Sequence, residues 1–382
     1  MHHNLKIDKL NILSEESDEY ILYGIGRNID LYRQCLKGKI KVAYGVDSNE
    51  KLHGTEIEGI KIESPAKLEN MSENQKILIL TGSICSVRKQ LNQMNKVEYK
   101  DYFYVRDFIP IWYWRQENKI VLTDTSFLIT FMCTLKCKYC SLKIPYCKEK
   151  EHRKLVDLKN DLDLYFKSVD FVYNFKIMGG EPTMLPELAE LIRYIGEKYR
   201  KKIGNVKLVT NATIPLSDEI LKAIKEHNVM VEINDYSEFV CYKNSVVQYI
   251  KKLEMLQIPY VSYRTTRDDK WVFFGNPREK KFIEESEIRQ HFHDCAYYSR
   301  GLVNGKLYYC TINAALAELK VIEYDDNDYL DLLKAEGKDN FFDLEIGNLK
   351  KGYCTLCESC NGDYDVNQVL LPAGEQLGGK NE

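Results

Sequence analysis

This sequence of 382 residues lacks several features that would place a protein in a class at once. Its formal net charge is only −3, with 54 Lys and Arg against 57 Asp and Glu, so it has no electrostatic footprint for nucleic acid. No apolar run approaches the roughly 20 residues that span a bilayer, and the first residues contain no apolar core of a secretory signal. We therefore expect a cytosolic protein with no nucleic-acid partner and no membrane partner.

Cysteine, in contrast, is abundant, with 12 residues in the chain. Cysteines in the cytosol seldom form disulfides, so a dozen of them, mostly in clusters, indicate metal ligation. Cys35, Cys85 and Cys241 stand alone, and we predict them to be buried small residues. Cys147 lies near a cluster of cysteines but outside its spacing, so we expect a structural role for it too.

The first cluster consists of Cys133, Cys137 and Cys140, directly after the strand-like run 126–132. The three thiols therefore share a loop at the carboxyl end of a strand. Three thiolates on one loop suit three irons of a [4Fe–4S] cluster and leave the fourth iron open for a reactant. A structural zinc loop is the alternative. Zinc usually takes a fourth ligand, however, and the loop contains no histidine.

A second motif follows the apolar run 171–178 and consists of Gly179, Gly180, Glu181 and Pro182. Paired glycines let a ligand approach the backbone closely, and Glu181 with the neighbouring carbonyls can accept hydrogen bonds from an ammonium group. By itself the motif would more often be a plain strand-to-helix turn. Together with the cysteine loop, it resembles the radical SAM superfamily over roughly residues 120–290.

The resemblance implies that the three cysteines hold a [4Fe–4S] cluster and that the Gly-Gly-Glu-Pro turn receives the amino group of S-adenosylmethionine. In the family, polar residues at later strand ends contact the ribose and carboxylate of this cofactor. Taken alone, each such residue would more often be an ordinary polar residue of a surface or turn. The residues that the resemblance assigns to S-adenosylmethionine are Tyr139, Gly179, Gly180, Glu181, Pro182, Asn211, Asn234 and Arg264.

From residue 126 onward, strand-like and helix-like segments alternate, which is typical of a parallel α/β fold. In such a sheet the reactive groups gather at the carboxyl ends of the strands. The predicted strands are 126–132, 171–178, 205–210, 229–234 and 258–264. The predicted helices are 156–169, 186–200, 217–227 and 244–256.

The amino-terminal part begins with a strand that runs into a turn containing Gly24 and Gly26, and a second strand ends at Asp47. This order matches a dinucleotide fold, in which glycines make room for a phosphate and an acid meets a ribose. The third glycine of that pattern is missing. The stretch 46–65 resembles the Rossmann-like domain that precedes some sugar-nucleotide acyltransferases. We expect either a nucleotide site at these three residues or a purely structural or partner-binding module.

Five further cysteines lie near the carboxyl end: Cys295, Cys310, Cys354, Cys357 and Cys360. Asn304-Gly305 predicts a two-residue hairpin turn that brings the first two of them together. The set resembles the SPASM/twitch extension, which implies one auxiliary [4Fe–4S] cluster. Cys295, Cys310, Cys357 and Cys360 are the favoured ligands, and Cys354 competes with them. A zinc ribbon is the alternative, because paired x2 cysteines suit tetrahedral zinc.

The predicted fold class is therefore α/β. It comprises a Rossmann-like domain over residues 1–118, a partial (β/α)6 radical SAM barrel over 119–290 and a small twitch/SPASM-like cluster domain over 291–382.

The resemblance implies reductive cleavage of S-adenosylmethionine to a 5′-deoxyadenosyl radical, with an external electron donor such as flavodoxin or ferredoxin. We expect oxidation or epimerisation of an activated sugar. A SPASM-type enzyme that modifies ribosomal peptides is the alternative, although no winged-helix-like segment is evident. A non-catalytic iron–sulfur scaffold or sensor is a further alternative, which the intact Gly-Gly-Glu-Pro motif disfavours. Candidates for returning a hydrogen atom to a product radical are Cys241, Tyr236 and Tyr263.

Overall fold

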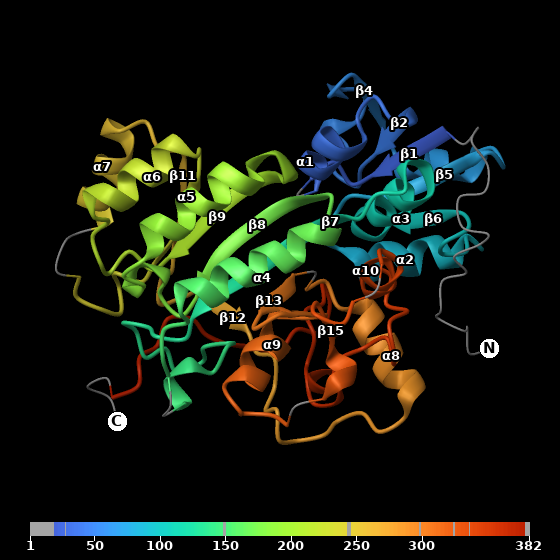
Figure 1. The fold of residues 1–382 in the computed structure, drawn as a ribbon. Coiled ribbons are helices and arrows are strands. Elements are labelled where there is room, and N and C mark those ends of the chain that lie inside the picture. Colours follow the sequence, from blue (N-terminus) through green and yellow to red (C-terminus); the bar gives the residue numbers. More distant parts are fainter. Residues whose placement is uncertain are drawn as a thin grey trace.

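The structure is a computed structural model that describes residues 19–26, 28–147, 150–242, 246–297, 299–323, 325–335 and 337–378. Two main sheets organise these residues (Figure 1). Residues 1–18 and the start of the predicted helix 244–256 lie outside the described residues. Within the described part, no helix is both long enough and apolar enough to cross a bilayer.

The first sheet has the strand order β3-β4-β2-β1-β5-β6 and is parallel apart from the β3–β4 pair. Its strands are β1 (Glu19–Tyr23), β2 (Lys41–Val46), β3 (Glu56–Ile57), β4 (Ile60–Glu63), β5 (Gln75–Ile79) and β6 (Tyr102–Tyr104). Its helices are α1 (Ile29–Leu31), which continues as a π-helical turn (Tyr32–Leu36), α2 (Ile84–Gln93) and α3 (Val105–Glu117). We call residues 19–117 the amino-terminal module.

The second sheet has the order β11-β10-β9-β8-β7-β13-β14-β15, in which the first six strands are parallel. Its strands are β7 (Val121–Thr130), β8 (Phe171–Gly179), β9 (Ile203–Thr210), β10 (Met230–Asp235), β11 (Tyr260–Arg264), β13 (Arg300–Val303), β14 (Lys306–Tyr308) and β15 (Tyr329–Asp331). The intervening helices are α4 (Leu155–Ser168), α5 (Leu188–Tyr199), α6 (Asp218–Glu226) and α7 (Val246–Met255). The predicted α/β fold with a parallel sheet is confirmed.

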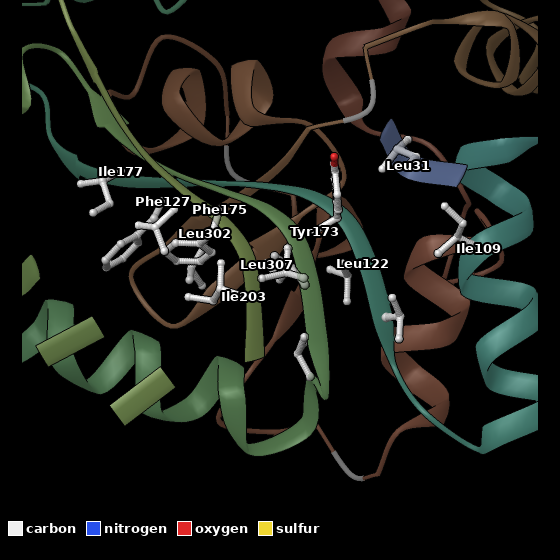
Figure 2. Close-up of a cluster of buried hydrophobic side chains, with 14 of the residues drawn as sticks. Leu31, Ile109, Leu122, Phe127, Tyr173, Phe175, Ile177, Ile203, Leu302 and Leu307 are labelled. Carbon is white, nitrogen blue, oxygen red and sulfur yellow. The ribbon is translucent and has the colours of Figure 1, made fainter. Parts of the chain in front are cut away.

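The two faces of the second sheet differ because side chains alternate along each strand. One face packs against α4: the Thr125 Oγ1 and Tyr165 Oη atoms are 2.8 Å apart, and the rings of Phe127 and Phe175 lie 5.8 Å apart. Figure 2 shows these two phenylalanines side by side in the buried layer. The opposite face, which we call the inner face, carries polar side chains and leads to the carboxyl-end loops.

The carboxy-terminal part extends this same sheet, since β13 pairs in parallel with β7 and antiparallel with β14. Asn304 and Gly305 form the predicted turn with φ of +49° and +70°, as a tight hairpin requires. The remaining elements are α8 (Glu285–Asp294), α9 (Thr311–Glu318), α10 (Asp339–Glu345) and the antiparallel pair β12 (Lys270–Val272) and β16 (Leu370–Pro372). The predicted boundary at residue 290 falls inside α8, and the division into domains stays a prediction.

The amino-terminal module packs directly on the carboxy-terminal part. Trp114 of α3 stacks on Phe342 of α10 with ring centroids 4.7 Å apart. Arg88 and His293 both contact the largely buried carboxylate of Glu98, at 2.8 and 3.0 Å. One continuous cluster of buried apolar side chains includes Leu31 and Ile109 of the module together with Leu122 of β7, all labelled in Figure 2.

Candidate functional site

The Gly-Gly-Glu-Pro turn holds the loop that carries Cys133. The Gly180 amide donates to the Thr130 carbonyl at 2.8 Å, and the Glu181 amide donates to the Met132 carbonyl at 2.7 Å. A Cβ atom on Gly180 would lie 2.0 Å from that Met132 oxygen, which no side chain tolerates. The paired glycines are therefore required because the backbone leading into the cysteine loop passes directly over them.

Glu181 is fully buried and its carboxylate accepts several hydrogen bonds. The Thr183 amide and hydroxyl donate at 3.1 and 2.6 Å, the Thr210 hydroxyl at 2.7 Å and the Asn211 amide at 2.7 Å. Burial raises the pKa of this carboxyl group, although its donors act in the opposite direction. Glu181 thus ties the end of β8 to the end of β9. Two backbone carbonyls of the turn are also engaged, since those of Glu181 and Pro182 accept from the amides of Met184 and Leu185 at 3.1 and 3.0 Å.

Two side-chain amides reach the sulfur atoms of the cysteine loop. Asn211 Nδ2 lies 3.8 Å from Cys133 Sγ and donates to Thr134 Oγ1 at 3.1 Å. Gln376 Nε2 donates to Cys137 Sγ at 3.2 Å. Asn211 was predicted as a cofactor-binding residue. Gln376 was not, since nothing in the sequence links it to a loop so far away along the chain.

The three thiols of the loop are mostly buried, and this burial raises the pKa of Cys133 to about 12 and that of Cys137 to about 11. Burial also raises the pKa of Cys140. The thiolate is the form that binds soft metals, and N–H donors to sulfur are among the groups that tune iron–sulfur clusters. A buried loop with three thiols and two amide donors to sulfur therefore fits a [4Fe–4S] cluster.

The remaining residues predicted to bind the cofactor divide into two groups. Asn234 is half-buried, and its side chain makes no hydrogen bond to any other described residue, so it is free for a ligand. Tyr139 is also half-buried, next to Lys138. Arg264 is 63% exposed and pairs with Glu238 at 3.2 Å. It is in register with Asp235 rather than Asn234, so it lies on the opposite face of the sheet and its position does not support the predicted contact.

Among the three candidates for hydrogen return, the structure brings only Tyr236 to the cysteine loop. Burial, together with the nearby thiols of Cys137 and Cys140, raises the pKa of Tyr236. Its ring packs edge-on against Trp271 with centroids 5.8 Å apart. Tyr263 is 55% exposed. Cys241 is also exposed, so the prediction that it is buried is wrong: it lies on the loop after β10 and not in a core.

All five carboxy-terminal cysteines line one cavity of about 80 Å³. Cys354 Sγ and Cys357 Sγ are 3.3 Å apart. Backbone amides donate to two of the other sulfurs, from Gly362 to Cys360 at 3.2 Å and from Asp363 to Cys295 at 3.4 Å. Among the residues that the structure describes, no group of three or more His, Cys, Asp or Glu is arranged to hold a metal ion as it stands. The choice between an auxiliary cluster and zinc stays open in this geometry.

The side chain of Asp47 holds the glycine turn of the amino-terminal module in place. Asp47 accepts hydrogen bonds from the amides of Ile25 and Asn49, both at 2.8 Å. Gly24 has a φ of +79°, and a Cβ atom there would lie 2.7 Å from Thr81 Cβ. These residues therefore shape the turn and its packing on the next strand. The nucleotide site predicted at Gly24, Gly26 and Asp47 stays a prediction.

Charged and amide side chains line the inner face of the second sheet. Lys176 Nζ lies 2.9 Å from Asp124 Oδ2, and Lys207 Nζ lies 3.4 Å from Glu232 Oε2. Ser299, just before β13, donates its hydroxyl to Asp124 at 2.7 Å. This polar face was missed. The alternation of Asn174 and Lys176 with apolar residues along β8 was the signal for it.

Residues 127–257 match the family model for the radical SAM superfamily. The chain carries a radical SAM domain. The matched segment contains the Cys133 loop, the turn at Gly180 and the strand end at Asn211. The radical SAM family binds S-adenosylmethionine and a [4Fe–4S] cluster, in agreement with the prediction for this segment.

Relatives of the radical SAM domain match it over short stretches. An uncharacterized protein of Methanocaldococcus jannaschii is 30% identical over 115 residues, covering 28% of this chain and 26% of that protein. A probable GTP 3′,8-cyclase of Methanococcus maripaludis is 34% identical over 87 residues, covering 22% of this chain and 27% of the cyclase. The chain thus spans about a quarter of the length of these curated relatives.

Two solved structures are similar at low identity. BtrN in complex with AdoMet and 2-DOIA has a TM-score of 0.43 and 13% identity, over 66% of this chain and 100% of that one. A structure of anSMEcpe with bound AdoMet and a peptide has a TM-score of 0.37 and 14% identity, over 65% of this chain and 93% of that one.

Proposed function

We propose that this protein is a radical SAM enzyme that abstracts a hydrogen atom from an activated sugar, leading to oxidation or epimerisation. When bound, a reduced [4Fe–4S] cluster and S-adenosylmethionine supply a 5′-deoxyadenosyl radical. The observation that carries the proposal is the position of the polar inner face. It adjoins the carboxyl ends of the strands, where Cys133, Glu181 and Asn211 lie. A substrate on that face lies next to the site where the radical forms.

The chain's own residues have separate tasks in this reaction. Cys133, Cys137 and Cys140 would hold the cluster, while Glu181 keeps the ends of β8 and β9 in place. Asn234, whose side chain makes no hydrogen bond to another described residue, would orient the cofactor by hydrogen bonding. Tyr236, which lies near the thiols of Cys137 and Cys140 and packs against Trp271, would limit the access of water, which protects a radical from side reactions.

The chemistry of the inner face supports a sugar as the substrate. The Lys176–Asp124 pair and the neighbouring Ser299 place hydrogen-bond donors and acceptors next to one another. Carboxylates accept hydrogen bonds from hydroxyl groups, and ammonium groups donate to them. A polyhydroxylated molecule satisfies such a surface better than an apolar peptide segment does.

The carboxy-terminal cysteines would hold one auxiliary [4Fe–4S] cluster, and their position supports this part of the proposal. Tyr297 lines both the cysteine cavity and a second cavity that reaches Asp124 and Lys176. A cluster in the first cavity would therefore be separated from the inner face by little more than this one ring. That arrangement suits a centre that accepts an electron from a substrate radical.

The test is the formation of 5′-deoxyadenosine by anaerobically reconstituted, reduced protein, with and without a panel of sugars, sugar phosphates and nucleotide-sugars. We expect one member of the panel to accelerate formation and to be converted. Basal formation that no sugar changes would contradict the sugar proposal and favour a peptide substrate. No formation at all, in protein with full iron content, would contradict radical chemistry and favour a scaffold or sensor.

A further inference from the structure

We propose that the amino-terminal module and the radical SAM domain form one binding chamber for a small phosphorylated sugar, whose phosphate is bound by Arg106. This inference rests on the proposed function and narrows it. The chamber is a cavity of about 290 Å³ between three parts of the chain. It is lined by Asn28, Tyr104 and Arg106 of the module, Asp124 and Lys176 of the inner face, and Tyr297 of the carboxy-terminal part.

The size of the chamber limits its ligand. Small-molecule sites measure about 300–1,000 Å³, so a cavity of 290 Å³ lies at the lower end of the range. A monosaccharide with one phosphate fits this space. A nucleotide-sugar or a folded peptide segment is too large to be enclosed by it.

Arg106 is the reason for placing a phosphate in the chamber. It is the second residue of α3, it is partly buried, and its Nη2 lies 3.4 Å from Asn28 Oδ1. No carboxylate among the described residues pairs with its guanidinium, whereas Lys176, which also lines the chamber, has Asp124 as a partner. A guanidinium group matches the oxygens of a phosphate in a bidentate arrangement.

The other acidic groups of the chamber are already engaged. Asp365 accepts hydrogen bonds from the amides of Cys85 and Ser86 at the start of α2, at 3.0 and 3.1 Å. Asp363 accepts from Gln368 at 3.0 Å. These contacts turn both carboxylates toward neutral donors of the protein while each keeps its negative charge. The phosphate is therefore placed at Arg106, whose guanidinium pairs with no carboxylate among the described residues.

The part of the chamber at Asp124 and Lys176 suits hydroxyl groups and leads toward the reactive edge. Asp124 is buried and accepts from Lys176 and Ser299, and a carboxylate has room for a further hydroxyl donor. Lys176 precedes Gly179 by three positions, which is about 10 Å along a strand. A sugar whose phosphate is bound by Arg106 therefore extends its ring along the inner face toward the Gly-Gly-Glu-Pro turn.

The experiment is isothermal titration calorimetry on protein reconstituted with its clusters, without reductant, using hexose 1-phosphates, the matching free hexoses and inorganic phosphate. We expect at least one hexose 1-phosphate to bind more tightly than the free hexose or inorganic phosphate alone. Replacing Arg106→Ala removes a charge-assisted hydrogen bond and should weaken that binding roughly 10- to 100-fold. Arg106→Lys keeps the charge and should recover part of the affinity.

The matched control is Arg115→Ala, which removes an exposed arginine from the same helix and should leave the affinity unchanged. Equal melting temperatures for the variants would show that α3 still folds. The proposal is overturned if no hexose 1-phosphate binds, if the free hexose binds equally well, or if Arg106→Ala binds as tightly as the unaltered protein.

Failure of this inference can be told apart from failure of the proposed function, because binding is measured without turnover. Arg106-dependent binding without any 5′-deoxyadenosine formation would keep the chamber and reject the radical chemistry. Turnover of a sugar that carries no phosphate, with unaltered kinetics in Arg106→Ala, would keep the function and reject the chamber.

Discussion

Gln376 donates its side-chain amide to Cys137 Sγ at 3.2 Å across 239 positions of sequence. The orientation of the amide follows from its other contact, because its oxygen accepts from the Lys136 amide at 2.9 Å. Backbone hydrogen bonds of Lys138 with Glu375 at 2.7 Å and of Leu377 with Lys136 at 2.8 Å hold the same segment against the cysteine loop. The end of the chain thus forms a cover over the proposed cluster.

Gln376→Leu should lower the reduction potential of the cluster at Cys133, Cys137 and Cys140. An N–H donor to a ligand sulfur stabilises the more negative, reduced state. A net hydrogen bond is worth about 0.5–1.5 kcal/mol, so the expected change for one electron is roughly 20–60 mV. The measurement is a redox titration followed by the EPR signal that responds to S-adenosylmethionine. A shift no larger than that of Gln116→Leu, an exposed glutamine, would contradict the role.

Gly180→Ala should prevent the cysteine loop from taking its position. The new Cβ would meet the Met132 carbonyl oxygen at 2.0 Å, and a backbone atom cannot move aside as the end of a flexible side chain can. We expect the free energy of unfolding to fall by about 3 kcal/mol and the iron content after reconstitution to drop. Gly26→Ala is the control, because nothing lies within 4 Å of its Cβ position. Equal iron content in both variants would refute the prediction.

Glu98→Gln should weaken the contact between the amino-terminal module and α8. Burial alone would raise the pKa of Glu98, but His293 and Arg88 outweigh it and lower the pKa to about 2. A lowered pKa means that the carboxylate stabilises the fold above its ordinary value near 4.5 and loses this effect as the pH falls toward 2. The contribution at pH 7 is about 3 kcal/mol.

Denaturation in urea at pH 7 and at pH 3 would check this prediction. The difference between unaltered protein and Glu98→Gln should be largest at pH 7 and should shrink at pH 3. Glu69→Gln changes an exposed glutamate of the same module and controls for the general effect of acid. A difference that stays constant with pH would show that the charge of Glu98 is not responsible.

Cys310→Ser should remove the proposed auxiliary cluster without affecting the cluster at Cys133. Each [4Fe–4S] cluster holds four irons, so the iron content should fall from about eight to about four per chain. Cys35→Ser, which alters a buried cysteine of the amino-terminal module, should leave the content unchanged. The same analysis on Cys295→Ser and Cys354→Ser would show which of the five cysteines the cluster does not need. One zinc per chain in place of the second set of irons would establish the zinc ribbon instead.

The position of the glycine pair could be predicted from a local sequence pattern, but its packing could not. The sequence placed Gly179 and Gly180 at a strand end, where the structure has them, because an apolar run followed by a turn motif is a local signal. The structure adds a second reason for the glycines to the close approach of a ligand, which stays a prediction. Gly179 makes room for the Thr130 backbone and Gly180 for the Met132 backbone. Both contacts depend on where β7 ends beside β8, and no local pattern reports that.

The polar inner face illustrates a signal that was present but not used. Asn174 and Lys176 alternate with Phe175 and Ile177 along β8, and a period of two already implies one polar and one apolar face. Arg264 shows the opposite case, since its strand-end position was predicted correctly but the sequence did not indicate its face. Which face a side chain takes depends on register, which in this strand follows from pairing with β10.

The sequence by itself determined the α/β class, the radical SAM domain and the two groups of cysteines, because strand periodicity and ligand spacing are local properties of the chain. Only the tertiary structure decided that Gln376 contacts Cys137, that five cysteines line one cavity and that Arg106 and Lys176 line another. These relationships join residues far apart in sequence. They arise from the packing of whole sheets and helices on one another, and that packing is a property of the complete fold.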